Sequence, residues 1–95
     1  MRSTAFYVIG YDIPDDRRRY KVARFLEQVG TRVQYSVFEA YLGPATLEKL
    51  RSKLEEVLEI ELDQVRFYRL CEPCRQTVQV LGQGAVSSPP GVMIV

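Results

Sequence analysis

Three carboxylates lie within five residues of one another in the stretch FYVIGYDIPDD near the N-terminus. Asp12 ends an apolar run, and Asp15 and Asp16 open the next element. A structural role explains two of them, since Asp15 suits a helix N-cap and Asp16 suits the first turn of the same helix. Asp12 precedes that turn, so two interpretations stay open: a functional carboxylate held at a strand end, and ordinary turn chemistry.

The chain contains no histidine, which limits its chemistry. Histidine is the commonest general acid or base and the commonest ligand of transition metals. Its absence excludes histidine-paired nucleases and hydrolases of the Ser-His or Cys-His type. Any catalysis would have to use carboxylates, hydroxyls, cysteines or a bound cation.

Two cysteines, Cys71 and Cys74, form the motif CEPC. A redox pair of the thioredoxin type needs a helix directly after the first cysteine, whereas here we expect a strand after a short polar stretch. One C-x-x-C is also half of a zinc site, and the other half would have to come from a second chain. We predict an incidental loop pair, with redox and zinc roles as alternatives.

Five of the thirteen lysines and arginines crowd into eight positions after the acidic turn: Arg17, Arg18, Arg19, Lys21 and Arg24. Cations at a helix start oppose the helix dipole and repel one another, at a cost of roughly 0.3–1 kcal/mol each when exposed. One interpretation is a solvated face that neighbouring acids neutralise. We favour a patch that binds nucleic acid or another polyanion, because phosphates would offset the unfavourable placement.

Hydrophobic periodicity indicates the elements that must position these residues. In chain order it predicts a strand ending at Asp12, a helix from Asp15 to Val29, a strand from Thr31 to Leu42, a helix from Pro44 to about Ile60, and strands from Val65 to Leu70 and from Thr77 to Leu81. We take this as an α+β protein with the ferredoxin-like βαββαβ fold, in which two helices cover one face of a four-stranded antiparallel sheet.

Ninety-five residues make one domain, which we place at residues 1–82, followed by a linker and a C-terminal edge strand at residues 83–95. The first two predicted strands are apolar on both faces, but two helices cover only one face. We therefore predict a homodimer packed sheet to sheet, with the terminal VMIV as a strand that can join the partner's sheet. No apolar run is long enough to span a bilayer, so we expect a cytoplasmic protein without membrane contact.

The stretches YDIPDD, RRRYKVARFLEQVG and above all RVQYSVFEAYL resemble the CRISPR-associated protein 2 family, over roughly residues 5–82. The resemblance implies ferredoxin-like homodimers that act in spacer acquisition, the adaptation stage of antiviral defence. It implies a metal-dependent endonuclease that cuts single-stranded RNA, as an endoribonuclease, or duplex DNA. It also implies a bridge between dimers of the CRISPR integrase, CRISPR-associated protein 1. The alternative function is a non-catalytic DNA-binding adaptor of the integrase, for which Asp12 is dispensable.

Position by position, the resemblance places the family's metal-binding carboxylate on Asp12. Other positions implicated in activity or nucleic-acid contact fall on Tyr11, Arg19, Lys21, Arg32, Ser36 and Phe38. The implied cofactor is Mg²⁺ or Mn²⁺, and two Asp12 side chains brought together by a dimer axis would make a better site than one. We expect Arg19 and Lys21 to hold phosphates and Phe38 to stack on or wedge beside nucleic acid.

Overall fold

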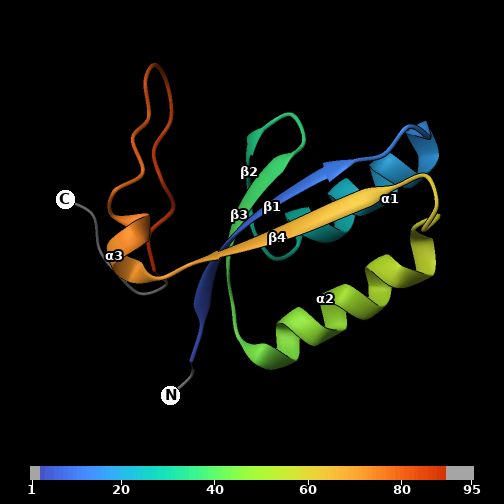
Figure 1. Cartoon of the computed structure of the whole chain (residues 1–95), viewed down its shortest axis with the longest axis horizontal. Helices are drawn as coiled ribbons and strands as arrows, with labels where there is room; N and C mark the ends of the chain where they lie inside the picture. The colour runs from blue at the N-terminus through green and yellow to red at the C-terminus, as the bar shows by residue number, and fades with distance from the viewer. Residues whose placement is uncertain (1–2, 90–95) are drawn as a thin grey trace.

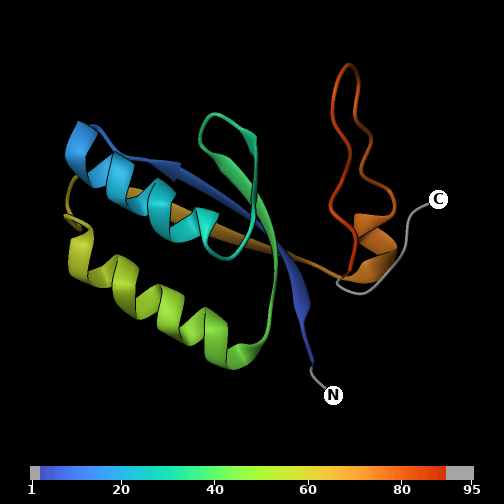
Figure 2. The same cartoon turned by 180° about the vertical axis from the view of Figure 1, so that it is seen from behind.

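The computed structural model describes residues 3–89, which form a four-stranded antiparallel sheet with two helices on one face (Figure 1). The elements in chain order are β1 (Ala5–Asp12), α1 (Asp16–Glu27), β2 (Thr31–Gln34), β3 (Val37–Leu42), α2 (Pro44–Val57), β4 (Gln64–Leu70) and the single-turn α3 (Glu72–Arg75). The strand order in the sheet is β2-β3-β1-β4. Figure 2 shows α1 and α2 together in front of the sheet, so the opposite face, called the helix-free face below, carries neither. The predicted α+β class and ferredoxin-like βαββαβ fold are confirmed.

The stretch from Thr31 to Leu42, predicted as one strand, is a hairpin of β2 and β3. The two strands pair antiparallel, and the chain reverses at Tyr35 and Ser36. Hairpin turns usually contain glycine, asparagine or proline, and this turn has none of them. β2 and β3 are the two consecutive strands in the βαββαβ order. The predicted elements had only one strand at this place.

Both helices begin where the sequence predicts. Asp15 caps α1, since its carboxylate accepts a hydrogen bond of 2.9 Å from the backbone N–H of Arg18. Pro44 opens α2, where its missing N–H costs nothing. The helices end two and three residues earlier than predicted, at Glu27 and Val57.

The core lies between the sheet and the two helices. Ile9 of β1 and Phe38 of β3 are fully buried cross-strand partners, and Leu26 of α1 and Leu54 of α2 belong to the same buried cluster. Burying each such side chain contributes about 1.5–3 kcal/mol. Because β1 pairs with a strand on each side and packs on this core, the position of its last residue is fixed.

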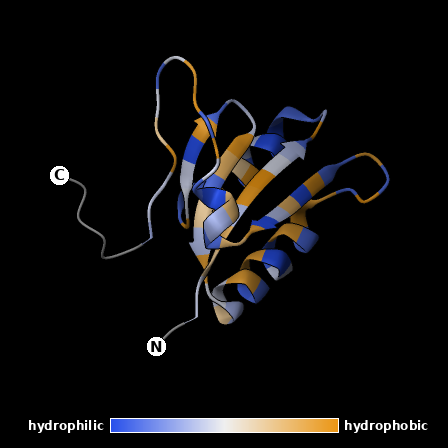
Figure 3. Cartoon of the chain, turned by 60° about the vertical axis from the view of Figure 1, so that its left-hand side comes forward, coloured by the Kyte–Doolittle hydropathy of each residue, from blue (hydrophilic) through white to orange (hydrophobic). Residues whose placement is uncertain are grey.

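The helix-free face is partly exposed. Val8, Glu39 and Tyr68 are cross-strand neighbours there, and Tyr68 is 50% exposed. Phe6, on the same face, is buried, with its ring centroid 5.2 Å from that of Tyr41. Figure 3 shows the alternation of hydrophobic and hydrophilic residues along the strands. A face without helices is therefore confirmed, but it is only partly uncovered, because Phe6 and Glu39 on it are buried.

The chain after α3 runs beside β2 and β3 without forming a strand. Ser87 is held at both ends, because its carbonyl accepts a hydrogen bond of 3.0 Å from Arg75 and its N–H donates one of 2.8 Å to the buried carboxylate of Glu39. The strand predicted from Thr77 to Leu81 is wrong, since no residue from 71 to 89 lies in a strand. The predicted terminal strand at residues 92–95 lies outside the described residues. Within residues 3–89 no helix combines the length and apolar character needed to cross a membrane.

Candidate metal and nucleic-acid site

Asp12 is exposed at the end of β1. Its cross-strand partner on β4 is Gln64, and the two-residue period of a strand places both on the helix-free face, on the opposite side from Ile9 and Tyr11. Among residues 3–89 no lysine or arginine forms an ion pair with this carboxylate. Asp12 is thus a rigidly placed carboxylate that is open to solvent.

One chain supplies only a small part of a metal site. Within residues 3–89 no three His, Cys, Asp or Glu side chains gather where they could hold an ion. Mg²⁺ favours oxygen ligands and commonly takes one or two carboxylates together with water and substrate phosphate. Asp12 fits that donor set as one ligand among several.

Arg19 holds the loop that follows Asp12. Its Nη1 donates to the carbonyl oxygens of Ile13 and Pro14, at 2.9 and 3.4 Å, and its Nη2 donates to the carboxylate of Asp16. A planar guanidinium can make several such bonds at once, which an ammonium group cannot do in the same geometry. The first task of Arg19 is therefore to fix the backbone beside Asp12.

Tyr11 and Ser36 connect the end of β1 to the hairpin turn. The backbone N–H of Tyr11 donates to the carbonyl of Ser36 at 3.1 Å, and its hydroxyl donates to the carbonyl of Tyr35 at 3.4 Å. Burial raises the pKa of Tyr11 above its ordinary value, and the nearby Arg32 opposes this shift. The Tyr11 hydroxyl is consequently protonated near neutral pH and has a structural role. Ser36 contributes to the same connection through its backbone carbonyl.

Phe38 has no exposed surface, so the direct stacking on nucleic acid expected of it is wrong for this structure. It supports another predicted residue instead: the guanidinium of Arg32 lies 5.2 Å from the centroid of the Phe38 ring. Arg32 also approaches Glu27 of α1, with an N–O distance of 3.5 Å. The Phe38 ring therefore helps to hold the guanidinium of Arg32 in its position.

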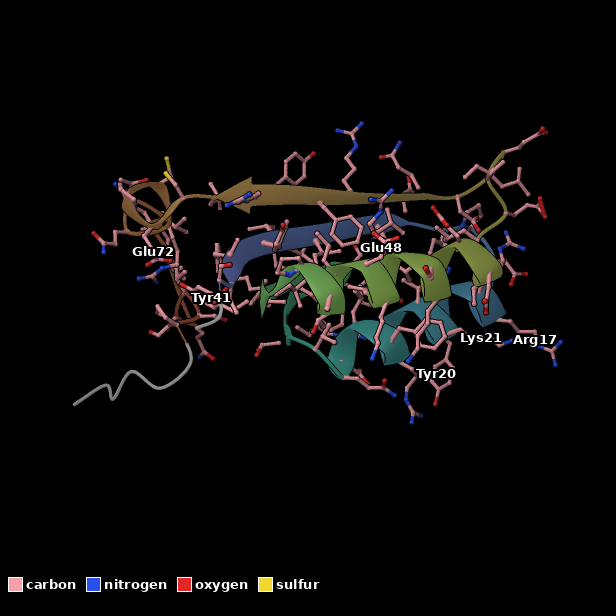
Figure 4. The ribbon with its side chains drawn as sticks, turned by 90° about the horizontal axis from the view of Figure 1, so that it is seen from below. Arg17, Tyr20, Lys21, Tyr41, Glu48 and Glu72 are labelled. Carbon is pink, nitrogen blue, oxygen red and sulfur yellow. The ribbon has the colours of Figure 1, made fainter. Side chains whose placement is uncertain are left out.

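The five cations of the predicted basic patch do not act alike. Arg17 and Lys21 are exposed and project from α1 in Figure 4. Arg24 lies along Tyr20, to whose hydroxyl it donates at 2.9 Å. Arg18 instead turns inward and binds Asp63. Since Arg19 is occupied by the loop, Arg17 and Lys21 are the cations best placed to meet phosphates.

Asp63 is a residue that the sequence analysis missed. It precedes β4, its side chain is 0% exposed, and it accepts two bonds from Arg18, at 2.7 and 3.0 Å, and one from the backbone N–H of Glu59 at 2.9 Å. The bond from Arg18 lowers the pKa of Asp63. The only sequence signal was an acid directly before a strand, which is too common to predict a partner 45 positions away.

A hollow of about 250 Å³ lies beside the end of β1, on the side of the helices. Arg19, Arg32, Tyr20 and Tyr35 contribute to its wall, and the two tyrosines are 62% and 75% exposed. Cations beside exposed aromatic rings suit a nucleotide chain, whose phosphates attract the first and whose bases stack on the second. Tyr20 and Tyr35 were not among the predicted site residues.

Cations clustered along one helix, as on α1, are the electrostatic footprint of proteins that bind nucleic acids. A comparison with protein families identifies the particular family. The family model described as CRISPR associated protein Cas2 matches residues 5–78, and the chain belongs to this family.

Curated relatives match most of the chain. A protein named CRISPR-associated endoribonuclease Cas2 3, from Synechocystis sp., is 46% identical over 94% of this chain and 97% of its own length. CRISPR-associated endonuclease Cas2 2 from Thermus thermophilus is 46% identical, with 82% of each chain covered. The resemblance recognised in the sequence is thereby confirmed.

Solved structures agree with the fold. A hypothetical protein of Thermus thermophilus matches with a TM-score of 0.79 and 42% identity, covering 87% of this chain and 96% of its own. Cas2 of Streptococcus pyogenes matches with a TM-score of 0.73 and 29% identity, over 81% and 99%. A chain of a partial Cas6-RT-Cas1–Cas2 complex matches with a TM-score of 0.73 and 31% identity, over 81% and 90%.

Proposed function

We propose that this chain is an endoribonuclease of the CRISPR adaptation machinery, which cleaves phosphodiester bonds of single-stranded RNA with Mg²⁺ or Mn²⁺. Duplex DNA is a second substrate class for the same chemistry. The observation that carries the proposal is the place of Asp12, exposed at the end of a central strand and on the face without helices. Relatives named endoribonuclease and endonuclease support the reaction class.

The reactive unit in this proposal is a homodimer. Two copies packed through their helix-free faces would bring two Asp12 carboxylates to a common axis, and each would be one oxygen ligand of a shared ion. Such an ion supplies an activated water and stabilises charge on the phosphate. Arg19 keeps the loop beside each Asp12 in place, and Arg17 and Lys21 hold flanking phosphates.

The test compares the wild type with Asp12→Asn, and uses Glu48→Gln on the outer side of α2 as a matched control. We expect Asp12→Asn to lose RNA cleavage by about a hundredfold or more, because an amide is a poor ligand for Mg²⁺. The melting temperature and the oligomeric state should stay as in the wild type, and the control should cleave normally. Undiminished metal-dependent cleavage by purified Asp12→Asn would sink the assignment.

A second function is favoured by the exposure of Arg17 and Lys21. In this alternative, the chain is a non-catalytic adaptor that holds DNA and bridges the CRISPR integrase, CRISPR-associated protein 1. A structural neighbour solved as part of a Cas6-RT-Cas1–Cas2 complex supports such a partner. Phosphate contacts of this kind give DNA binding that weakens steeply with salt.

A spacer-acquisition assay separates the two functions. The adaptor role requires acquisition to persist in Asp12→Ala and to fall in a double variant with Arg17→Glu and Lys21→Glu. If the nuclease is required for acquisition, Asp12→Ala alone should abolish it. Arg18 and Arg19 are unsuitable for charge reversal, because each makes internal bonds that hold the fold.

A further inference from the structure

The CEPC motif remains without a role in the proposed function, and the structure changes how it is interpreted. The strand expected after it is absent: Cys71 is the N-cap residue of α3, which begins at Glu72, and Cys74 lies within that helix. Both side chains are exposed free thiols. A single helical turn of four residues therefore follows the first cysteine directly, in place of the expected polar stretch and strand.

The helical turn holds the two cysteines at a distance that suits a disulfide. It is closed by hydrogen bonds of 2.9 Å from the N–H of Arg75 to the carbonyl of Cys71 and 3.0 Å from the N–H of Gln76 to the carbonyl of Glu72. Residues three apart in such a turn have Cα atoms about 5 Å apart. Disulfides span Cα distances of about 4.4–6.8 Å, so the pair can close without moving the backbone.

The two thiols are chemically unequal. Hydrogen bonds from the backbone N–H and the thiol of Cys74 lower the pKa of Cys71, whereas the interaction with Cys71 raises the pKa of Cys74. In thiol–disulfide exchange the thiolate is the nucleophile, and its partner must then attack the mixed disulfide. The turn thus presents a nucleophilic cysteine with a resolving cysteine beside it.

Contacts to the sheet fix α3 in place. The hydroxyl of Tyr41 on β3 donates to Glu72 at 2.8 Å, and Arg75 binds the same carboxylate at 3.0 Å (Figure 4). Burial and the bond to Glu72 raise the pKa of Tyr41 to about 12. Since Glu72 is engaged on both oxygens, it is not available as a third ligand beside the sulfurs, and this favours redox chemistry over a metal site.

We propose that Cys71 and Cys74 form a reversible thiol–disulfide site whose oxidant is a low-molecular-weight disulfide. The Cys71 thiolate attacks one sulfur of that disulfide, forming a mixed disulfide and releasing one thiolate. The Cys74 thiol then gives its proton to the released thiolate and attacks Sγ of Cys71, which forms the Cys71–Cys74 bond, breaks the mixed disulfide and releases the second thiolate, to be protonated by water. The two cysteines are oxidised by two electrons, and one small disulfide becomes two thiols.

The test equilibrates the full chain with mixtures of reduced and oxidised glutathione at several ratios and then alkylates the remaining thiols. We expect the thiol count to fall from two to zero per chain in one transition, and the intact mass of the oxidised chain to lack two hydrogens with no glutathione attached. Addition of excess reduced glutathione should restore both thiols.

Single variants supply the control. Cys74→Ser should react with an aromatic disulfide near neutral pH about tenfold faster than Cys71→Ser, because it keeps both the Cys71 thiol and the backbone N–H of residue 74 that lowers the pKa of that thiol. Stable glutathione adducts on both cysteines of the wild type, or disulfides between chains only, would overturn the proposal. So would bound zinc that shields the thiols until a chelator is added.

Discussion

Asp63 is a carboxylate withdrawn from solvent and satisfied by three hydrogen bonds, two of which come from Arg18. The pair joins the first turn of α1 to the residue before β4. Breaking such a pair on one side leaves the other charge without compensation, which is costly in a desolvated place. Arg18, although it belongs to the predicted basic patch, therefore stabilises the fold.

The lowered pKa of Asp63 predicts a dependence of stability on pH. A carboxylate whose pKa is lower in the folded state stabilises the fold above its unfolded pKa, near 4, and this stabilisation is lost as the pH falls through the folded pKa. Asp63→Asn should therefore melt below the wild type at about pH 7, and the difference should shrink as the pH falls below about 4. Thermal unfolding followed by circular dichroism at several pH values measures this.

Glu48→Gln is the matched control, since Glu48 is exposed on α2. It should show the melting temperature of the wild type at each pH. A constant deficit of Asp63→Asn across the whole range would contradict the linkage argument and would point to packing alone.

At the residue scale, the sequence sufficed for groups whose role depends on local position. Asp15 as an N-cap follows from the residues around it, and so does Asp12 at a strand end. Phe38 and Asp63 did not follow, because burial and pairing depend on segments far away in the chain. Arg18 illustrates the limit: its charge was visible in the sequence, but its partner was not.

Gly30 shows what the connection between α1 and β2 requires. A Cβ placed there would lie 2.5 Å from the carbonyl oxygen of Glu39 and 2.9 Å from Cβ of Ala40. Both atoms belong to β3, at the centre of the sheet, and neither can move cheaply. The end of α1 thus packs on the hairpin through a residue without a side chain.

Gly30→Ala should lower the free energy of unfolding by about 1–3 kcal/mol, because the overlap forces the backbone of β3 to shift. Urea unfolding measures the change. Gly10→Ala, whose Cβ would come no closer than 3.9 Å to its neighbour, should stay within about 0.5 kcal/mol of the wild type. Equal effects of the two substitutions would contradict the close-approach argument.

At the element scale, periodicity predicted α1, α2, β1 and β4 well, because each buries one regular stripe or row of side chains. It could not divide the hairpin at Tyr35, where apolar residues continue through the turn without a break signal. It also predicted a strand from Thr77 to Leu81, although no strand of residues 3–89 pairs with it. A strand depends on a partner, which propensity alone does not supply.

At the scale of the whole molecule, neither α1 nor α2 covers the helix-free face, and the chain after α3 covers only the part of it around Glu39. We expect the chain to sediment at about twice the 10.9 kDa of one copy at micromolar concentration. Val8→Asp would place an unpaired charge on that face and should weaken self-association by about a hundredfold or more. Sedimentation equilibrium measures both.

Lys49→Glu on the exposed side of α2 is the control and should leave the mass unchanged. A wild-type protein that sediments as a single copy at these concentrations would contradict the dimer. If Val8→Asp and Lys49→Glu weakened self-association equally, the effect would come from the change in net charge and not from the helix-free face.

The three bonds of Arg19 bear on how mutational screens of this family member are read. A saturation screen will score position 19 as intolerant to substitution. Loss of the Arg19 side chain removes the hydrogen bonds to the carbonyls of Ile13 and Pro14, so the loop beside Asp12 is no longer held in place. Such a score reports lost geometry at Asp12, and it carries no information about contact with a substrate. The melting temperature of Arg19→Ala in the absence of substrate distinguishes the two roles, because loss of the internal bonds lowers it and loss of a phosphate ligand alone does not.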